Sequence, residues 1–300
     1  MSFTRKLKLH IPDNGKSFNT IFNGLDVSEN TRKEYVLRIK LFFSYLDDTG
    51  FNQQSYLLFK RYLEGRTDYS IATKNKYLIT ARIFLRELVR KGFLPIDITQ
   101  GIKGFKQSRR HKRLGLTDKE IQLLGVKLKF LPDTSKHNRQ RAIFSLLAFQ
   151  GLRQIEITRL NVEDVDVKKK TAFIQGKGSD DKEMIYLTPA TTKSLERYLK
   201  DYRQPQGALF SSMGNRKSDR ISTMTIKREM KYLLKDLGIE KTVHGFRHFY
   251  VTELLKTMDM RDVRKFSRHH SMEMLIVYDD EVSIRHKSQQ VFQVMEKFNY

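Results

Sequence analysis

The sequence contains no cysteine among its 300 residues. Disulfide bonds, zinc sites built from thiolates and a cysteine nucleophile are therefore excluded, and any metal would have to be held by histidines and carboxylates. No apolar run approaches the length of about eighteen residues that a membrane-spanning helix needs. The residues that follow Met1 lack the apolar core of a secretory signal, so we expect a cytoplasmic protein with no membrane contact.

Acidic residues are scarce relative to basic ones. The chain has 57 lysines and arginines but only 34 aspartates and glutamates, which gives a formal net charge of +23. An excess of this size indicates a polyanionic partner, either nucleic acid or an acidic membrane surface. Because the basic residues are dispersed through sequence with helical patterning, and are not gathered in a tail, we favour nucleic acid.

Hydrophobic spacing divides the chain into two domains joined by a basic linker. Residues 1–27 contain proline, glycines and polar residues, and we expect a loose arm there. Residues 28–102 are predicted to form a small helical domain with helices at Ser28–Gly50, Ser55–Glu64 and Ser70–Lys91. The linker, residues 103–113, holds six lysines and arginines and no acid. Such a tether is either simply solvated or follows the phosphate backbone of a duplex.

The second domain, residues 114–300, is predicted to be mainly helical with one small antiparallel β-sheet. Alternating apolar residues around 165–174 suggest a hairpin, and Met184–Leu187 supplies a third strand. Thr117 and Glu120 resemble a capping box that opens a helix. The stretch Ser288–Phe298 has the pattern of an amphipathic helix.

Five separated motifs in this second domain carry the chemistry, although each is weak alone. They are Gly151-Leu152-Arg153-Gln154-Ile155-Glu156, Gly176-Lys177-Gly178, His244-Gly245-Phe246-Arg247-His248, His269 and Tyr278. The Gly-Lys-Gly loop is not a P-loop, which needs four residues between its glycines. The two histidines of the third motif have zinc-ligand spacing, but Gly245 stands where a zinc protease needs glutamate.

In this order the motifs resemble the tyrosine recombinase and integrase family, the Xer-type and phage-integrase-like enzymes. The family pattern is an Arg in Gly-Leu-Arg-x-x-Glu, a Lys on a β-hairpin, His-x-x-Arg, a His or Trp, and a Tyr nine residues later. The matching residues here are Arg153, Lys177, His244, Arg247, His269 and Tyr278. The chain departs from the family at Ser267-Arg268, where Leu-Gly is usual, and at Phe249, where a hydroxyl residue is common. His270 follows directly, but the spacing to Tyr278 favours His269.

The chemistry of phosphodiester cleavage explains these residue types. The reaction needs a nucleophile, neutralisation of the non-bridging oxygens and a proton for the leaving 5′-oxygen. A tyrosine hydroxyl has a pKa of about 10, so Tyr278 needs a base or a cationic pocket. Arg153 and Arg247 can each offer a bidentate fork to phosphate oxygens. The remaining roles are proton acceptor for His244, phosphate hydrogen bonding for His269 and protonation of the leaving oxygen for Lys177.

The resemblance implies a two-domain clamp on duplex DNA, with a helical SAM-like N-terminal domain and a mixed α/β catalytic domain. It implies site-specific recombination through a 3′-phosphotyrosyl intermediate and a Holliday junction, with no metal, ATP or other cofactor. The partners are then a double-stranded recombination site and, on synapsed DNA, three further copies of the chain. Phosphate contacts are expected at Arg32, Lys33, Lys74, Lys76, Arg82, Arg86, Lys106, Arg109 and Arg110.

Several alternatives stay open from the sequence. A type IB topoisomerase shares the nucleophile chemistry, and a DNA-binding protein without chemistry shares the charge, although it has no need of the assembled motifs. The target site, the choice among integration, excision, inversion and dimer resolution, and any accessory protein are undetermined. So are the oligomeric state of the free protein, for which we expect a monomer, and whether the C-terminal helix docks on its own or a neighbouring protomer.

Overall fold

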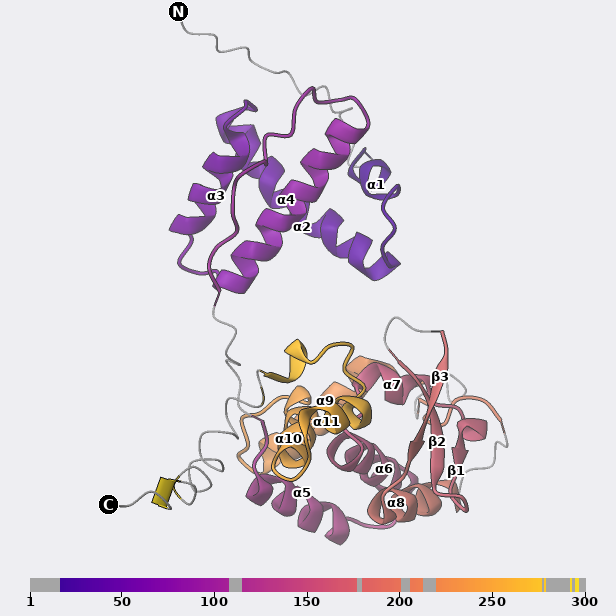
Figure 1. The fold of residues 1–300 in the computed structure, drawn as a ribbon. Helices are drawn as coiled ribbons and strands as arrows, with labels where there is room; N and C mark the ends of the chain where they lie inside the picture. The colour runs from indigo at the N-terminus through magenta and orange to yellow at the C-terminus, as the bar shows by residue number, and fades with distance from the viewer. Residues whose placement is uncertain are drawn as a thin grey trace, which may run out of the picture. The chain divides into compact units, whose positions relative to one another are not determined.

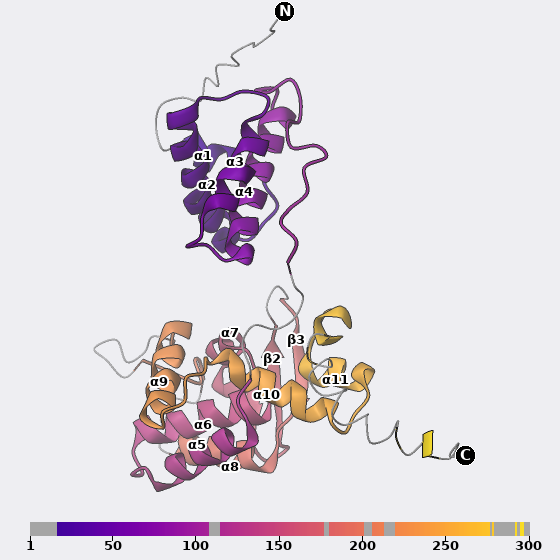
Figure 2. The same ribbon diagram turned by 90° about the vertical axis from the view of Figure 1, so that its left-hand side faces the viewer.

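The chain folds into two compact units, Met1–Ser108 and Arg109–Tyr300, each with its own hydrophobic core (Figures 1 and 2). The computed structural model describes residues 17–107, 115–176, 180–200, 206–212 and 220–276, with 278, 292, 295 and 296. The prediction of a mainly helical chain with a small antiparallel sheet in its second half is confirmed. Among the described helices, none has both the length and the apolar character needed to cross a membrane.

The first unit is a bundle of helices α1 (Ser17–Phe22), α2 (Glu29–Thr49), α3 (Ser55–Gly65) and α4 (Ile71–Arg90). The serines expected to begin two of them do so, because the hydroxyl of Ser28 accepts from the Thr31 amide and that of Ser70 accepts from the Thr73 amide. Phenylalanines from all four helices fill the centre, and the rings of Phe42 and Phe59 meet edge to face at 4.8 Å.

Two predictions about the ends of this unit are wrong. Residues 17–22 form helix α1 instead of belonging to a loose arm, because Phe22 is fully buried and its ring contacts that of Phe84. The start of the expected linker is also attached, since Phe105 packs against the core of the unit. The Asn75 side chain fixes it by accepting from the Phe105 amide at 2.8 Å and donating to the Phe105 carbonyl at 3.0 Å.

The second unit surrounds one central helix. Its helices are α5 (Asp118–Phe130), α6 (Ser135–Phe149), α7 (Gln154–Arg159), α8 (Pro189–Lys200), α9 (Thr223–Asp236), α10 (His244–Leu255) and α11 (Met260–Ser267). Every residue of α6 from Asn138 to Ala148 is buried, and α5, α8, α9 and α10 all pack against it. Thr117 and Glu120 form the predicted capping box at the start of α5.

A three-stranded antiparallel sheet lies at one side of this unit (Figure 1). Its strands follow chain order, β1 (Val165–Asp166), β2 (Thr171–Gln175) and β3 (Lys182–Tyr186). Ala172 and Ile174 of β2 point into the core, whereas Phe173 pairs with Met184 on the outer face. Strands β2 and β3 therefore form a regular hairpin, and Lys177, which follows β2 in the sequence, lies outside the described residues.

Candidate active site

The loop between α6 and α7 shapes the first part of the site. Gly151 has a φ of +58°, and a Cβ atom there would lie 2.3 Å from the Tyr250 ring, so only glycine fits. The turn places Arg153 at the N-cap of α7 and frees the Gly151 carbonyl to accept a hydrogen bond from α10. The Gly-Leu-Arg sequence is thus explained by a backbone turn that positions the arginine.

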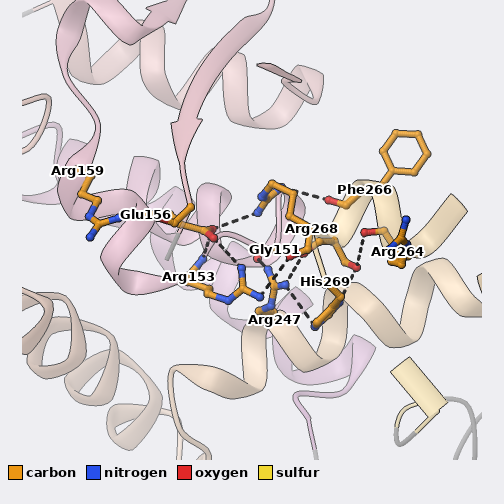
Figure 3. A network of polar contacts seen from close by, with 11 residues as sticks. Gly151, Arg153, Glu156, Arg159, Arg247, Arg264, Phe266, Arg268 and His269 are labelled. Carbon is orange, nitrogen blue, oxygen red and sulfur yellow. Dashed lines mark hydrogen bonds and ion pairs between the residues drawn. The ribbon is translucent and has the colours of Figure 1, made fainter. Parts of the chain in front are cut away.

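Glu156, in the first turn of α7, is fully buried between two guanidinium groups (Figure 3). Its carboxylate accepts from the Arg153 side chain and from the Arg153 amide, both at 2.8 Å, and lies 3.2 Å from the Arg268 guanidinium. Burial opposes ionisation, but the charge of Arg268 and the bonds from Arg153 outweigh it and hold the pKa of Glu156 below its ordinary value. Glu156 is therefore an anion that orients Arg153.

Arg247, one turn into α10, is 2% exposed. It donates to the Gly151 carbonyl at 2.6 Å and to the Ser267 carbonyl, and so ties three separate segments together. Burial and the neighbouring charge of Arg153 lower the pKa of Arg247 to about 10. The side chain stays a cation at neutral pH, held close to a second cation.

His269 lies beside Arg247 with a defined tautomer. The Arg247 guanidinium donates to Nε2 at 3.3 Å, and because a guanidinium has no acceptor, Nε2 must accept. The ring proton is then on Nδ1, 2.6 Å from the Ser267 hydroxyl. Burial, reinforced by the charges of Arg247, Arg153 and Arg268, lowers the pKa of His269 to about 3. The imidazole is neutral in the protein without DNA.

Tyr278 is 4% exposed and faces two histidine rings. Its ring centroid lies 4.8 Å from that of His248 and 5.9 Å from that of His269. Burial raises the pKa of the Tyr278 hydroxyl, while the charges of Arg247 and Arg153 act in the opposite direction. Tyr278 packs in a small core cluster with Val251, Val263 and Leu275, but the charges of two nearby arginines act on its hydroxyl, which sets it apart from an ordinary core residue.

The other predicted site residues differ in their burial and in whether the structure describes them. His244 begins α10 and is exposed, and its charge adds to the lowering of the pKa of His269, so it belongs to the same neighbourhood. Lys177 lies outside the described residues. Between the two adjacent histidines, His269 is buried against Arg247 whereas His270 is exposed.

Five of the predicted DNA-contacting residues have partners inside their own unit, and three of these donate to backbone carbonyls. Arg32 donates to the Phe22 and Leu25 carbonyls, Lys74 to the Glu64 carbonyl and Arg82 to the Ile102 carbonyl. Lys33 and Arg86 form surface ion pairs, with Glu29 at 2.6 Å and with Asp97 at 3.1 Å. Lys76 and Lys106 are exposed, and Arg109 and Arg110 lie outside the described residues. DNA contact by this set stays a prediction.

The sequence interpretation missed the part played by Arg268. It noted this residue only as a departure from a Leu-Gly pattern, yet the side chain is 7% exposed and reaches Glu156. A signal was present: a position that relatives fill with glycine often has a positive φ, and φ here is +54°. His248 was included in the third motif but was given no role in the recombinase site, although its ring packs on Tyr278.

The chain is similar to known proteins over most of its length. The Phage integrase family model matches residues 116–283, and the model of its N-terminal SAM-like domain matches residues 17–92. The tyrosine recombinase XerD of Listeria monocytogenes serotype 4b is 29% identical over 87% of this chain and 91% of its own length. The tyrosine recombinase XerC of Chlamydia caviae is 26% identical over 87% of this chain and 91% of its own.

Two solved structures have the same fold. XerH recombinase bound to a palindromic difH substrate, in a post-cleavage complex, superposes with a TM-score of 0.74 at 17% identity, covering 92% of this chain and 84% of its own. A lambda integrase tetramer bound to a Holliday junction has a TM-score of 0.68 at 15% identity, covering 88% and 75%. The chain therefore belongs to the phage integrase family and is a tyrosine recombinase, an enzyme of site-specific DNA strand breakage and rejoining.

Proposed function

We propose that Tyr278 is the nucleophile of this enzyme and attacks the scissile phosphorus of one DNA strand. A bond from phosphorus to the Tyr278 oxygen forms while the bond from phosphorus to the 5′-oxygen breaks, which leaves a 3′-phosphotyrosyl link and a free 5′-hydroxyl. The observation that carries the proposal is the environment of the Tyr278 hydroxyl. The tyrosine is buried beside His269, and the charges of Arg247 and Arg153 act to lower the pKa of its hydroxyl.

The two arginines are proposed to bind the non-bridging oxygens of the phosphate. Each guanidinium can form two parallel hydrogen bonds, and a donor set that is held in place before the reaction needs no reorganisation as charge develops. Arg153 and Arg247 meet this condition, since Glu156 holds the first and the Gly151 carbonyl holds the second. The Arg153 side chain, 24% exposed, is the more open of the two to an incoming phosphate.

Proton transfers complete the proposed step. His244 accepts the proton of Tyr278, and Lys177 donates a proton to the 5′-oxygen as that oxygen leaves. His269 contributes as a hydrogen-bonding group to the phosphate. Because its Nε2 is an acceptor in the free protein, donation to phosphate requires a second proton, which the negative charge of a bound phosphodiester would favour.

The phosphotyrosyl bond retains the free energy of the broken diester, so rejoining by the 5′-hydroxyl of a partner strand needs no ATP. We propose that the two units clamp a duplex recombination site and that four protomers exchange strands through a Holliday junction. The tetrameric lambda integrase complex with such a junction supports this assembly for the shared fold. The predicted C-terminal helix, 288–298, lies outside the described residues apart from Phe292, Met295 and Glu296.

A covalent-adduct assay tests the nucleophile. Random-sequence duplexes are first selected for binding to Tyr278→Phe, and the selected sites are rebuilt as nicked suicide substrates. The wild-type enzyme should form a denaturant-resistant protein–DNA adduct, and Tyr278→Phe should bind the same DNA without forming it. Tyr232→Phe, which alters an exposed tyrosine on α9, is the matched control and should keep the adduct. An adduct on Tyr278→Phe, or none on the wild type, would rule out the assignment.

A further inference from the structure

Arg268 occupies a backbone conformation that side chains avoid. It follows the last residue of α11 with φ +54° and ψ +46°, the left-handed region in which glycine is the usual helix-ending residue. Its amide donates to the Arg264 and Lys265 carbonyls, as a helix end requires, and any residue can supply that bond. An arginine at this position is therefore explained by its side chain and not by the turn.

The side chain is turned inward to Glu156. Its guanidinium is 7% exposed, lies 3.2 Å from the Glu156 carboxylate and donates to the Phe266 carbonyl at 3.1 Å. The Arg268 carbonyl accepts from the Arg153 guanidinium at 3.4 Å. Figure 3 shows Glu156 between Arg153 and Arg268, so the two cations share one buried anion across 112 residues of sequence separation.

Because Arg153 and Arg268 share Glu156, the cluster keeps a net positive charge. Arg153 and Glu156 alone form a neutral pair, which would offer little net attraction to a phosphodiester. Arg268 returns one positive charge to the cluster, and Arg247 adds another. Electrostatic interactions are stronger in a buried, weakly polarisable site than in water. The net charge of this cluster should therefore affect the binding of the scissile phosphate.

We propose that Arg268 is a positioning residue for strand cleavage: it neutralises Glu156, so that this carboxylate orients Arg153 without cancelling the charge that Arg153 presents to the scissile phosphate. The inference rests on the proposed function of Tyr278 and Arg153. It adds a third guanidinium to the site, at a place where the motif of the family has glycine.

The test is Arg268→Gly in the full-length enzyme. Glycine suits the left-handed backbone, so the fold should be retained, and thermal unfolding checks this. Single-turnover cleavage at saturating nicked duplex should fall about ten- to a hundredfold, the range typical of groups that orient a functional side chain. The dissociation constant for the same duplex should change by less than the cleavage rate does. Arg268→Lys, which returns a charge without the fork, should recover part of the loss.

Two further readouts separate positioning from a merely structural role. The charge of Arg153 opposes the burial that raises the pKa of Tyr278. If Arg153 is displaced in Arg268→Gly, the pH at which the cleavage rate increases should therefore move upward. A structural defect would instead lower the cleavage rate equally at every pH. In a Glu156→Gln background, Arg268→Gly should cause little further loss, because residues that act through one another are not additive.

The matched control is Lys265→Gln, which removes an exposed cation of the same helix that pairs with Asp262 at 3.2 Å. It should cleave at the wild-type rate. If Arg268→Gly also cleaves at that rate, or loses as much activity beside Glu156→Gln as alone, the positioning role is wrong while the nucleophile assignment stands. If the wild type forms no Tyr278-dependent adduct, the proposed function fails first and this inference fails with it.

Discussion

The second unit contains two buried clusters of arginine and glutamate that differ in their charge balance. On one side, Arg139 of α6 pairs with Glu229 of α9, and both side chains are nearly inaccessible. That cluster has one cation and one anion. In the candidate active site, as far as the described residues go, Glu156 is the one anion that pairs with Arg153 and Arg268, and Arg247 lies close to both cations.

This difference in charge balance distinguishes a structural ion pair from a site that binds an anionic ligand. A balanced pair satisfies its own charges and holds two helices together, and it has no reason to attract a ligand. A cluster with surplus buried cations costs desolvation and mutual repulsion, which an anionic ligand relieves. Burial is the main cause of the lowered pKa values of Arg247 and His269, and the charges of neighbouring cations lower both further.

The largest expected effect comes from removing a guanidinium group from the cationic cluster while its charge is kept. Arg247→Lys keeps the charge but loses the planar guanidinium that donates to the Gly151 and Ser267 carbonyls and that we propose binds the phosphate. Single-turnover cleavage of the selected nicked duplex should fall about a thousandfold, equivalent to about 4 kcal/mol of transition-state stabilisation. Equal loss of cleavage in an Arg139→Lys variant of matched stability would show that the two clusters are not functionally distinct.

Breaking the balanced pair should affect stability and not chemistry. Arg139→Met leaves the Glu229 carboxylate buried without its partner and should lower the free energy of unfolding by about 3 kcal/mol. Denaturant titration measures this, and cleavage per folded molecule should stay near the wild-type value. Arg139→Met combined with Glu229→Leu should recover much of the stability, since no buried charge remains. A double variant no more stable than the single one would contradict this.

The pH dependence of the free energy of unfolding should reveal the lowered pKa of His269. The unfolded chain takes up a proton near pH 6.5, but the folded protein holds His269 neutral until about pH 3. Between these values the unfolded state binds more protons, so acidification destabilises the fold, by about 2 kcal/mol from pH 6.5 to pH 5. Thermal or denaturant unfolding should show this slope in the wild type and a shallower one in His269→Gln. Equal slopes would mean that burial and the neighbouring charges do not hold this ring neutral in the folded protein.

The sequence was sufficient for the elements whose causes are local. Ser28 and Ser70 as helix caps, the Thr117 capping box and the hairpin around residues 165–174 follow from side chains that act within a few positions. The spacing of His269 and Tyr278 likewise identified two residues that the fold brings together.

What the sequence could not give depends on distant partners. In the sequence, Lys74 and Arg82 resemble solvated helix residues. In the structure, Lys74 donates to a carbonyl 10 positions away and Arg82 to one 20 positions away. Phe22 looks like part of a polar arm until the core that it fills is known. Arg268 is the clearest case, because its contact with Glu156 spans 112 positions of the sequence.

The smallest expected effect concerns exposed cations, which belong to neither cluster. Lys76 is exposed on α4, so Lys76→Gln should change the free energy of unfolding by less than about 0.5 kcal/mol. If this lysine contacts a phosphate, the variant should still bind DNA more weakly, and the slope of log affinity against log salt concentration should become shallower by about one. Lys193→Gln, on α8, is a candidate control and should leave the slope unchanged. An unchanged slope in Lys76→Gln would remove this residue from the proposed interface, because a released counterion is the physical signature of a phosphate contact.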